Sequence, residues 1–199
     1  LELTCSALRA ASRLRTSLDI LRVPNLTPAK LLRVAQHLAQ YTCVCSLRMG
    51  RSNMRPLVWP EMLAAMGPSG LHELCLQGTS VDIRLLTLRL FPLPAPLLVL
   101  ELSNVEGLTD ASLANAAFVM RNLQRLRLDG CRIGDLGVAS LAACTELRAL
   151  DLSVTRVTDA VTAHLAPLVA LEDLALVGTK VRSLGGLGTR LRRLRLGRS

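Results

Sequence analysis

The chain has 199 residues, of which half are apolar, 45 are leucine and four are aromatic. Its 24 Lys and Arg residues outnumber its 15 Asp and Glu residues, for a formal net charge of +9. This composition supplies a sizeable core and excludes a disordered chain. No apolar run reaches the roughly 18–20 residues that a bilayer requires, so no membrane span is predicted. With three histidines, the chain also has few residues for acid–base or metal chemistry.

A six-residue pattern, Leu-x-x-Leu-x-Leu, recurs along the chain at intervals of 20 to 27 residues. In Leu-x-Leu, both leucines face one side of a strand and the residue between them faces the other side. Apolar residues at helical spacing follow several copies, so each copy predicts one strand–helix unit, and such units stack into a solenoid with a continuous core. The middle leucines of the eight predicted units are Leu21, Leu47, Leu74, Leu100, Leu126, Leu150, Leu174 and Leu194.

The first two units have degenerate patterns, which begin at Leu18 and Val44. Between them, Thr27 predicts a helix N-cap, and Pro28 fits the first helical turn. Residues 51–68 follow the second predicted strand as an irregular segment that holds the single tryptophan. We therefore expect the N-terminal units to depart from the regular repeat.

The later units differ from one another in their connections. Three prolines precede the fourth strand and predict an extended connection there: Pro92, Pro94 and Pro96. Thr109-Asp110 and Thr158-Asp159 predict helix starts of the same kind as Thr27. The last unit has 20 residues, and its cluster Gly185-Gly186-Leu187-Gly188 predicts a tight turn with no room for a helix.

The six cysteines are too thinly spread for a small disulfide scaffold. Cys43 and Cys45 lack the spacing of a zinc site, and no second pair completes one. We therefore expect free thiols in a reducing compartment. Cys131 and Cys144 in particular should be reduced and packed in the core as small apolar groups.

Two segments of the middle units carry a family resemblance. Residues 126–135 read Leu-Arg-Leu-Asp-Gly-Cys-Arg-Ile-Gly-Asp, and residues 141–147 read Leu-Ala-Ala-Cys-Thr-Glu-Leu. They resemble leucine-rich repeats, specifically the cysteine-containing subfamily known from F-box substrate receptors. Other units have a threonine at the position of Cys131. No F-box motif is recognised in the sequence. The resemblance covers residues 18–199 and implies the same fold as the repeat does.

The predicted fold class is α/β, a leucine-rich-repeat solenoid of about eight strand–helix units. A parallel sheet should line the concave side, with the helices on the convex side. We expect one domain over residues 1–199. Because neither end shows a polar capping unit, we also expect the chain to be a fragment of a longer polypeptide or to be capped by partners.

The strand register predicts which side chains face outward on the concave side. These residues carry both signs of charge in nearly equal number and include no aromatic side chain, which disfavours a nucleic-acid cradle there. We expect the concave face to bind a partner. Its charged candidates are Arg22, Arg48, Glu73, Glu101, Arg125, Arg127, Asp151 and Asp173.

A basic edge is predicted at the C-terminal end of the chain, where arginines are dense and no acid lies among them. Such crowding favours contact with an acidic protein or a phosphate backbone, or leaves a solvated edge. We expect a further repeat, another subunit or a phosphate backbone to cover this edge. Its arginines are Arg190, Arg192, Arg193, Arg195 and Arg198.

No catalytic pattern is present: the sequence has no P-loop, no dinucleotide-binding fingerprint and no nucleophile elbow. The sequence therefore predicts a non-enzymatic protein–protein interaction scaffold within a larger assembly, without cofactor, metal or small-molecule substrate. One alternative is a structural subunit of a ribonucleoprotein, such as a mitochondrial ribosome, that contacts RNA through the basic edge. Another is a ubiquitin-ligase substrate receptor. The predicted location is intracellular, either cytoplasmic or mitochondrial.

Overall fold

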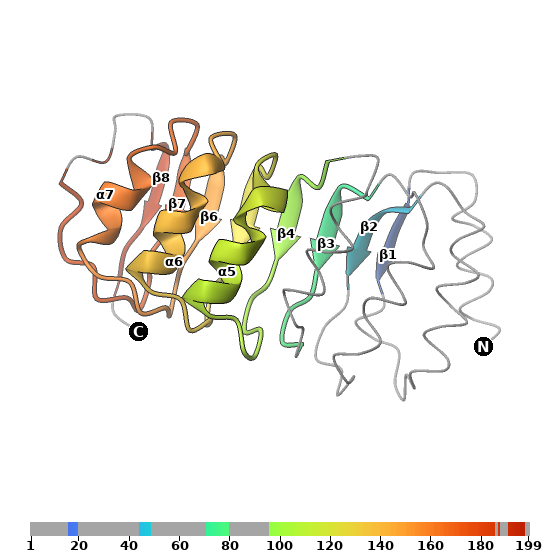
Figure 1. Cartoon of the computed structure of the whole chain (residues 1–199), viewed down its shortest axis with the longest axis horizontal. Coiled ribbons are helices and arrows are strands. Elements are labelled where there is room, and N and C mark those ends of the chain that lie inside the picture. Colours follow the sequence, from blue (N-terminus) through green and yellow to red (C-terminus); the bar gives the residue numbers. More distant parts are fainter. Residues whose placement is uncertain are drawn as a thin grey trace.

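The computed structural model describes residues 16–19, 44–48, 71–79, 96–185, 187 and 191–197. Within these residues, eight strands form one parallel sheet in which each strand pairs with the next along the chain (Figure 1). The strands are β1 (Thr16–Asp19), β2 (Val44–Arg48), β3 (Glu73–Cys75), β4 (Val99–Glu101), β5 (Arg125–Arg127), β6 (Ala149–Asp151), β7 (Asp173–Ala175) and β8 (Arg193–Arg195).

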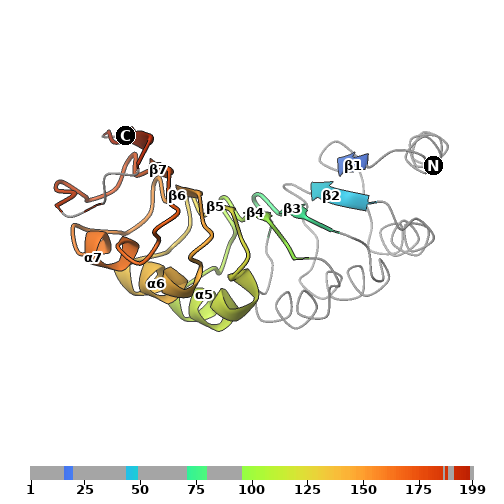
Figure 2. The ribbon, with the colours of Figure 1, turned by 90° about the horizontal axis from the view of Figure 1, so that it is seen from above.

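Helices occupy three connections in the described part of the chain. α5 (Asp110–Ala116) continues into the 3-10 helix η1 (Ala117–Met120), and α6 (Asp135–Ala139) continues into η2 (Ser140–Ala143). α7 (Val161–Leu165) precedes β7. Figure 2 shows the strands along the inner side of an arc and these helices along its outer side. The predicted α/β solenoid, with a concave parallel sheet and convex helices, is confirmed.

The pairing of strands aligns the middle leucines from one strand to the next. Leu74 pairs with Leu47 on one side and with Leu100 on the other, and the same row continues to Leu194 in β8. In β1, however, Leu18 pairs with Leu47, so the expectation that Leu21 takes the middle position is wrong by three residues. Leu18-Asp19-Ile20 has the same apolar alternation as Leu21-Arg22-Val23, and the period of two is therefore satisfied in either register.

The inner leucines build one continuous core between the sheet and the helices. Burying each such side chain stabilises the fold by about 1.5–3 kcal/mol. At β8 the burial falls, because Leu194 is 42% exposed and Leu196 is 51% exposed. The ten leucines predicted inside are 0–2% exposed, which confirms the register: Leu74, Leu76, Leu100, Leu102, Leu126, Leu128, Leu150, Leu152, Leu174 and Leu176.

The turns after β3 to β7 share one left-handed position, four residues beyond the middle leucine. A threonine follows it in three units, and its hydroxyl donates to the carbonyl three residues earlier, at 2.5 Å for Thr155 and 2.7 Å for Thr79 and Thr179. At the matching position, the thiol of Cys131 donates to the Leu102 carbonyl at 3.0 Å. The residues at this shared position are Gly78, Asn104, Gly130, Val154 and Gly178.

Aspartates near the helix starts bind each unit to the next. Asp110 accepts a hydrogen bond from the Gly134 amide at 2.7 Å, and Asp135 accepts one from the Thr158 amide at 2.9 Å. The predicted helix start at Thr109-Asp110 is confirmed, because Thr109 is the N-cap of α5. The start predicted at Thr158-Asp159 is wrong, since α7 begins at Val161. There the Asp159 carboxylate instead accepts backbone amides of the following unit.

Several sequence predictions fall on residues outside the described part of the chain. They concern the helix start at Thr27-Pro28, the segment 51–68, and the connection that contains Pro92 and Pro94. The same holds for three candidate binding residues: Arg22, Arg190 and Arg198.

Candidate functional site

Two rows of outward-facing residues cross the concave face, one on each side of the middle leucines. The strand pairing fixes which residues are neighbours within each row. The first row runs Ser46, Glu73, Val99, Arg125, Ala149, Asp173 and Arg193 from β2 to β8. The second row runs Arg48, Cys75, Glu101, Arg127, Asp151, Ala175 and Arg195.

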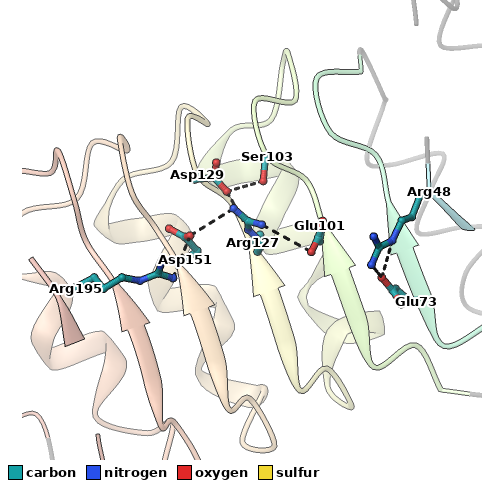
Figure 3. A network of polar contacts seen from close by, with 8 residues as sticks. All are labelled: Arg48, Glu73, Glu101, Ser103, Arg127, Asp129, Asp151 and Arg195. Carbon is teal, nitrogen blue, oxygen red and sulfur yellow. Dashed lines mark hydrogen bonds and ion pairs between the residues drawn. The ribbon is translucent and has the colours of Figure 1, made fainter. Parts of the chain in front are cut away.

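Arg127 is the centre of an ion-pair network in the second row (Figure 3). Its guanidinium lies 4.0 Å from Glu101 on β4, 3.8 Å from Asp151 on β6 and 3.4 Å from Asp129, which follows β5. Asp129 also accepts a hydrogen bond from the Ser103 hydroxyl at 2.5 Å. Three carboxylates therefore surround one arginine on the concave face.

Asp151 departs from the sequence expectation that it is exposed. Only 14% of its side chain is accessible, because Arg195 of β8 approaches to 3.9 Å while Arg127 lies on the other side. Arg127 itself keeps 43% of its side chain accessible. Ion pairs thus link the charged residues of the second row from Glu101 on β4 to Arg195 on β8.

Arg48 and Glu73 form a separate pair at the N-terminal side of the described face (Figure 3). The Arg48 guanidinium donates from Nη2 at 2.8 Å and from Nε at 3.2 Å to the same carboxylate oxygen. This hydrogen bond and the charge of Glu73 raise the pKa of Arg48 above its ordinary value. The pair joins the second row to the first. Each of these two charges is therefore already matched within the chain.

The arginines of the predicted basic edge are also paired with acids. Arg193 lies 3.6 Å from Asp173, and Arg192 lies 3.4 Å from Glu172. The edge segment itself contains no acid, because these carboxylates come from the preceding unit: Asp173 is the first residue of β7, and Glu172 lies just before it. Even so, the side chains of Arg192, Arg193 and Arg195 remain 77%, 81% and 73% accessible.

A groove of about 480 Å³ lies on the concave face between β5 and β8. Residues predicted as two separate sites, the concave face and the basic edge, line it together. The role of the small residues Ala149 and Ala175 between the arginine-bearing strands was not foreseen from the sequence. The charged lining residues are Glu101, Arg125, Arg127, Asp151, Asp173, Arg193 and Arg195.

The groove offers no reactive thiol. Cys75 belongs to the second row, but it is 3% exposed, and burial raises its pKa to about 11. Cys131 and Cys144 are buried with free thiols, as predicted, and burial raises the pKa of Cys144 to about 11 as well. Among the described residues, no group of three His, Cys, Asp or Glu side chains is placed to hold a metal ion.

No helix among the described residues has the length and the apolar character needed to cross a bilayer.

Comparisons with known proteins agree with the fold. Residues 119–142 match the family model described as Leucine Rich repeat. No curated protein matches the chain. Solved structures do: 41 chains match, among them the crystal structure of the TLR13–ssRNA13 complex. That match has a TM-score of 0.53 and 23% sequence identity, and it covers 83% of this chain but 24% of that chain.

A likeness at this level of identity shows the fold, and this chain spans about a quarter of the length of that protein. Together with the strand row and the matched repeat, it defines the chain as a leucine-rich-repeat solenoid.

Proposed function

We propose that the protein is a non-enzymatic scaffold that binds another protein through the groove between β5 and β8. The observation that carries this proposal is the groove itself, which places seven charged side chains of both signs on a rigid sheet. A mixed-charge surface selects a partner with the complementary arrangement and rejects others by like-charge repulsion. The curved sheet holds the side chains in fixed register, which lowers the entropy lost on binding.

A substitution that fills the groove without changing its charge tests this function. Ala149→Trp places an indole between β5 and β7, while Leu136→Trp adds the same group on α6, where Leu136 is 76% exposed. Both variants should have the melting temperature of the wild type. We expect partners recovered from a cell extract to be lost with Ala149→Trp and retained with Leu136→Trp, as measured by quantitative mass spectrometry. Equal recovery with both variants would exclude the groove as the binding surface.

A ribonucleoprotein role is the second candidate, and the accessible arginines of β8 favour it. Arg192, Arg193 and Arg195 keep about three quarters of their side chains accessible despite their ion pairs. The TLR13–ssRNA13 complex, whose protein has a similar fold, contains single-stranded RNA. Binding of this kind releases counterions, so the affinity for a single-stranded RNA should fall steeply as salt is raised. Affinity that is independent of salt would exclude it.

The ubiquitin-ligase alternative rests on the cysteine-containing unit. Cys131 and Cys144 occupy buried positions in one unit, as the resemblance to F-box-type repeats implies. That role needs an adaptor-binding segment in addition to the repeats. Free buried thiols at Cys75, Cys131 and Cys144 suit a reducing compartment, which we propose to be the cytoplasm or the mitochondrion.

A further inference from the structure

We propose that Arg125 is the recognition residue of the groove and that it binds an aspartate or glutamate side chain of the partner protein over Ala149. The inference rests on the proposed scaffold function, and it adds the chemical class of the group that is recognised.

The two rows of the concave face provide an internal comparison. Arg125 and Arg127 lie on the same strand, β5, on either side of Leu126. In the second row, the strands next to Arg127 contribute Glu101 and Asp151 at the paired positions. In the first row, the paired positions next to Arg125 are Val99 and Ala149. One arginine therefore has an acid on each side, and the other has an apolar residue on each side.

The next acid along the first row is already engaged. Asp173 lies two strand spacings from Arg125, roughly 10 Å, and it pairs with Arg193 at 3.6 Å. Among the described residues, Arg125 makes no ion pair, and its side chain is exposed. The space over Ala149 thus lies between an uncompensated guanidinium and a carboxylate whose own charge is matched.

One carboxylate fits this space better than a chain of phosphates does. A guanidinium binds a carboxylate through two parallel hydrogen bonds, which fixes both position and orientation. A nucleic-acid backbone would bring further negative charges against Glu101, Asp151 and Asp173, which line the same groove. No aromatic side chain lines the groove to stack a base. The geometry therefore selects a single acidic side chain on a protein.

Ala149→Asp is the sharpest test, because it supplies within the chain the acid that we expect from the partner. The new carboxylate would lie beside Arg125, as Asp151 lies beside Arg127, with Asp173 at the paired position on its other side. Attraction to Arg125 offsets repulsion from Asp173, so the variant should stay folded by circular dichroism. Ala163→Asp is the matched control, since Ala163 is exposed on α7 and the substitution adds the same charge on the outer side.

The probe is a displayed library of short random peptides, selected on the wild-type protein. Selected peptides should be enriched in Asp or Glu at one position. They should bind Ala149→Asp at least about tenfold more weakly, a difference of about 1.4 kcal/mol, and bind Ala163→Asp as the wild type. With Arg125→Glu, binding should be lost and then regained when the acidic residue of the peptide is replaced by lysine or arginine.

Three results would overturn the inference. Selected peptides without acidic enrichment, or acidic peptides that bind Ala149→Asp as tightly as the wild type, would remove Arg125 as the recognition residue. In either case, loss of peptide binding with Ala149→Trp would leave the scaffold function of the groove standing. Unchanged peptide binding with Ala149→Trp would contradict both the scaffold function and the role of Arg125. The third result would be a single-stranded RNA that displaces the peptides and binds Ala149→Asp more weakly than it binds the wild type. The ligand of the groove would then be a polyanion and not an acidic side chain of a protein.

Discussion

The turn after each strand adopts a left-handed backbone at one position in five consecutive units, whichever residue occupies it. Three units place glycine there, and glycine adopts this conformation without steric cost. The other two place Asn104, with φ of 55°, and Val154, with φ of 56°. A β-branched residue in this region is strained by about 1–3 kcal/mol. Since Val154 is 59% exposed, little packing energy offsets that strain.

Val154→Gly should therefore stabilise the protein. The relief of strain exceeds the additional chain entropy of glycine, about 0.5–1 kcal/mol, so we expect a net gain of about 1 kcal/mol. Urea unfolding monitored by circular dichroism measures the change. Gly130→Ala is the opposite control, because a Cβ at this left-handed position would overlap the Asn104 side chain. A lower midpoint for Val154→Gly would contradict the assigned strain.

Asp159 should titrate at unusually low pH. The amides of Arg182 and Ser183 donate to its carboxylate, and these bonds lower its pKa below the ordinary value. A lowered folded-state pKa means that the contribution to stability is present above the unfolded value, about 3.9, and is lost as pH falls through the folded value. The carboxyl carbon shift of Asp159 and the amide shifts of Arg182 and Ser183 should titrate together by NMR. A midpoint at or above the ordinary value would contradict this.

At the scale of the strand, each three-residue element depends on its middle leucine. Leu150 is 2% exposed and lies between Leu126 and Leu174 in the row. Leu150→Ala should cost about 2–5 kcal/mol through lost transfer energy and a residual cavity. Leu136→Ala removes the same atoms from a side chain that is 76% exposed and should cost far less. Equal unfolding midpoints for the two variants would contradict the central place of the leucine row.

The sequence was sufficient to predict the strands because a period of two with one buried face permits a single register. It failed at β1, where Leu18 and Leu21 offer equivalent alternations, and at α7, where Asp159 serves the next unit rather than the helix start. The groove was predicted only in part. Its charges were named as candidates, but the single groove depends on which strands are adjacent and on how far arginine side chains reach.

A signal for the groove is nevertheless present in the sequence. Written strand by strand, β5 to β8 read Arg-Leu-Arg, Ala-Leu-Asp, Asp-Leu-Ala and Arg-Leu-Arg. Aligning these triplets shows two arginine-bearing strands separated by two strands that each carry one acid and one alanine. Comparing the two columns then shows two arginines, Arg125 and Arg195, that have an alanine at the paired position on the neighbouring strand. The structure separates them, because Arg195 reaches Asp151 at 3.9 Å and Arg125 makes no ion pair among the described residues.

Across the whole molecule, the net charge of +9 is not explained by the groove. The groove has four arginines against three acids, so most of the excess lies elsewhere. Charges near a binding surface act chiefly on the rate of association and are screened by salt. Arg192, Arg193 and Arg195 at the β8 edge keep about three quarters of their side chains accessible, and the last two also line the groove. We expect these arginines to guide a partner to the groove rather than to hold the fold together.

Replacing Arg192, Arg193 and Arg195 together by glutamine tests that role. Each exposed ion pair contributes about 0–1 kcal/mol, so the variant should stay folded by circular dichroism. Its association with the partner should slow, and added salt should produce the same loss for the wild type. Stopped-flow association rates of the wild type and the variant, each at low and high salt, measure both effects. Unchanged rates would indicate that these arginines are only a solvated rim.

The groove spans four successive strands, and the last of them, β8, has partly exposed leucines, Leu194 at 42% and Leu196 at 51%. Because these leucines bury less apolar surface than those of β3 to β7, β8 should detach from β7 at a lower free energy than the more deeply buried strands separate. A partner that contacts both β5 and β8 binds only the closed arrangement, and by mass action it shifts that local equilibrium. Warming should therefore weaken binding through fraying of β8, several degrees before the rest of the sheet unfolds.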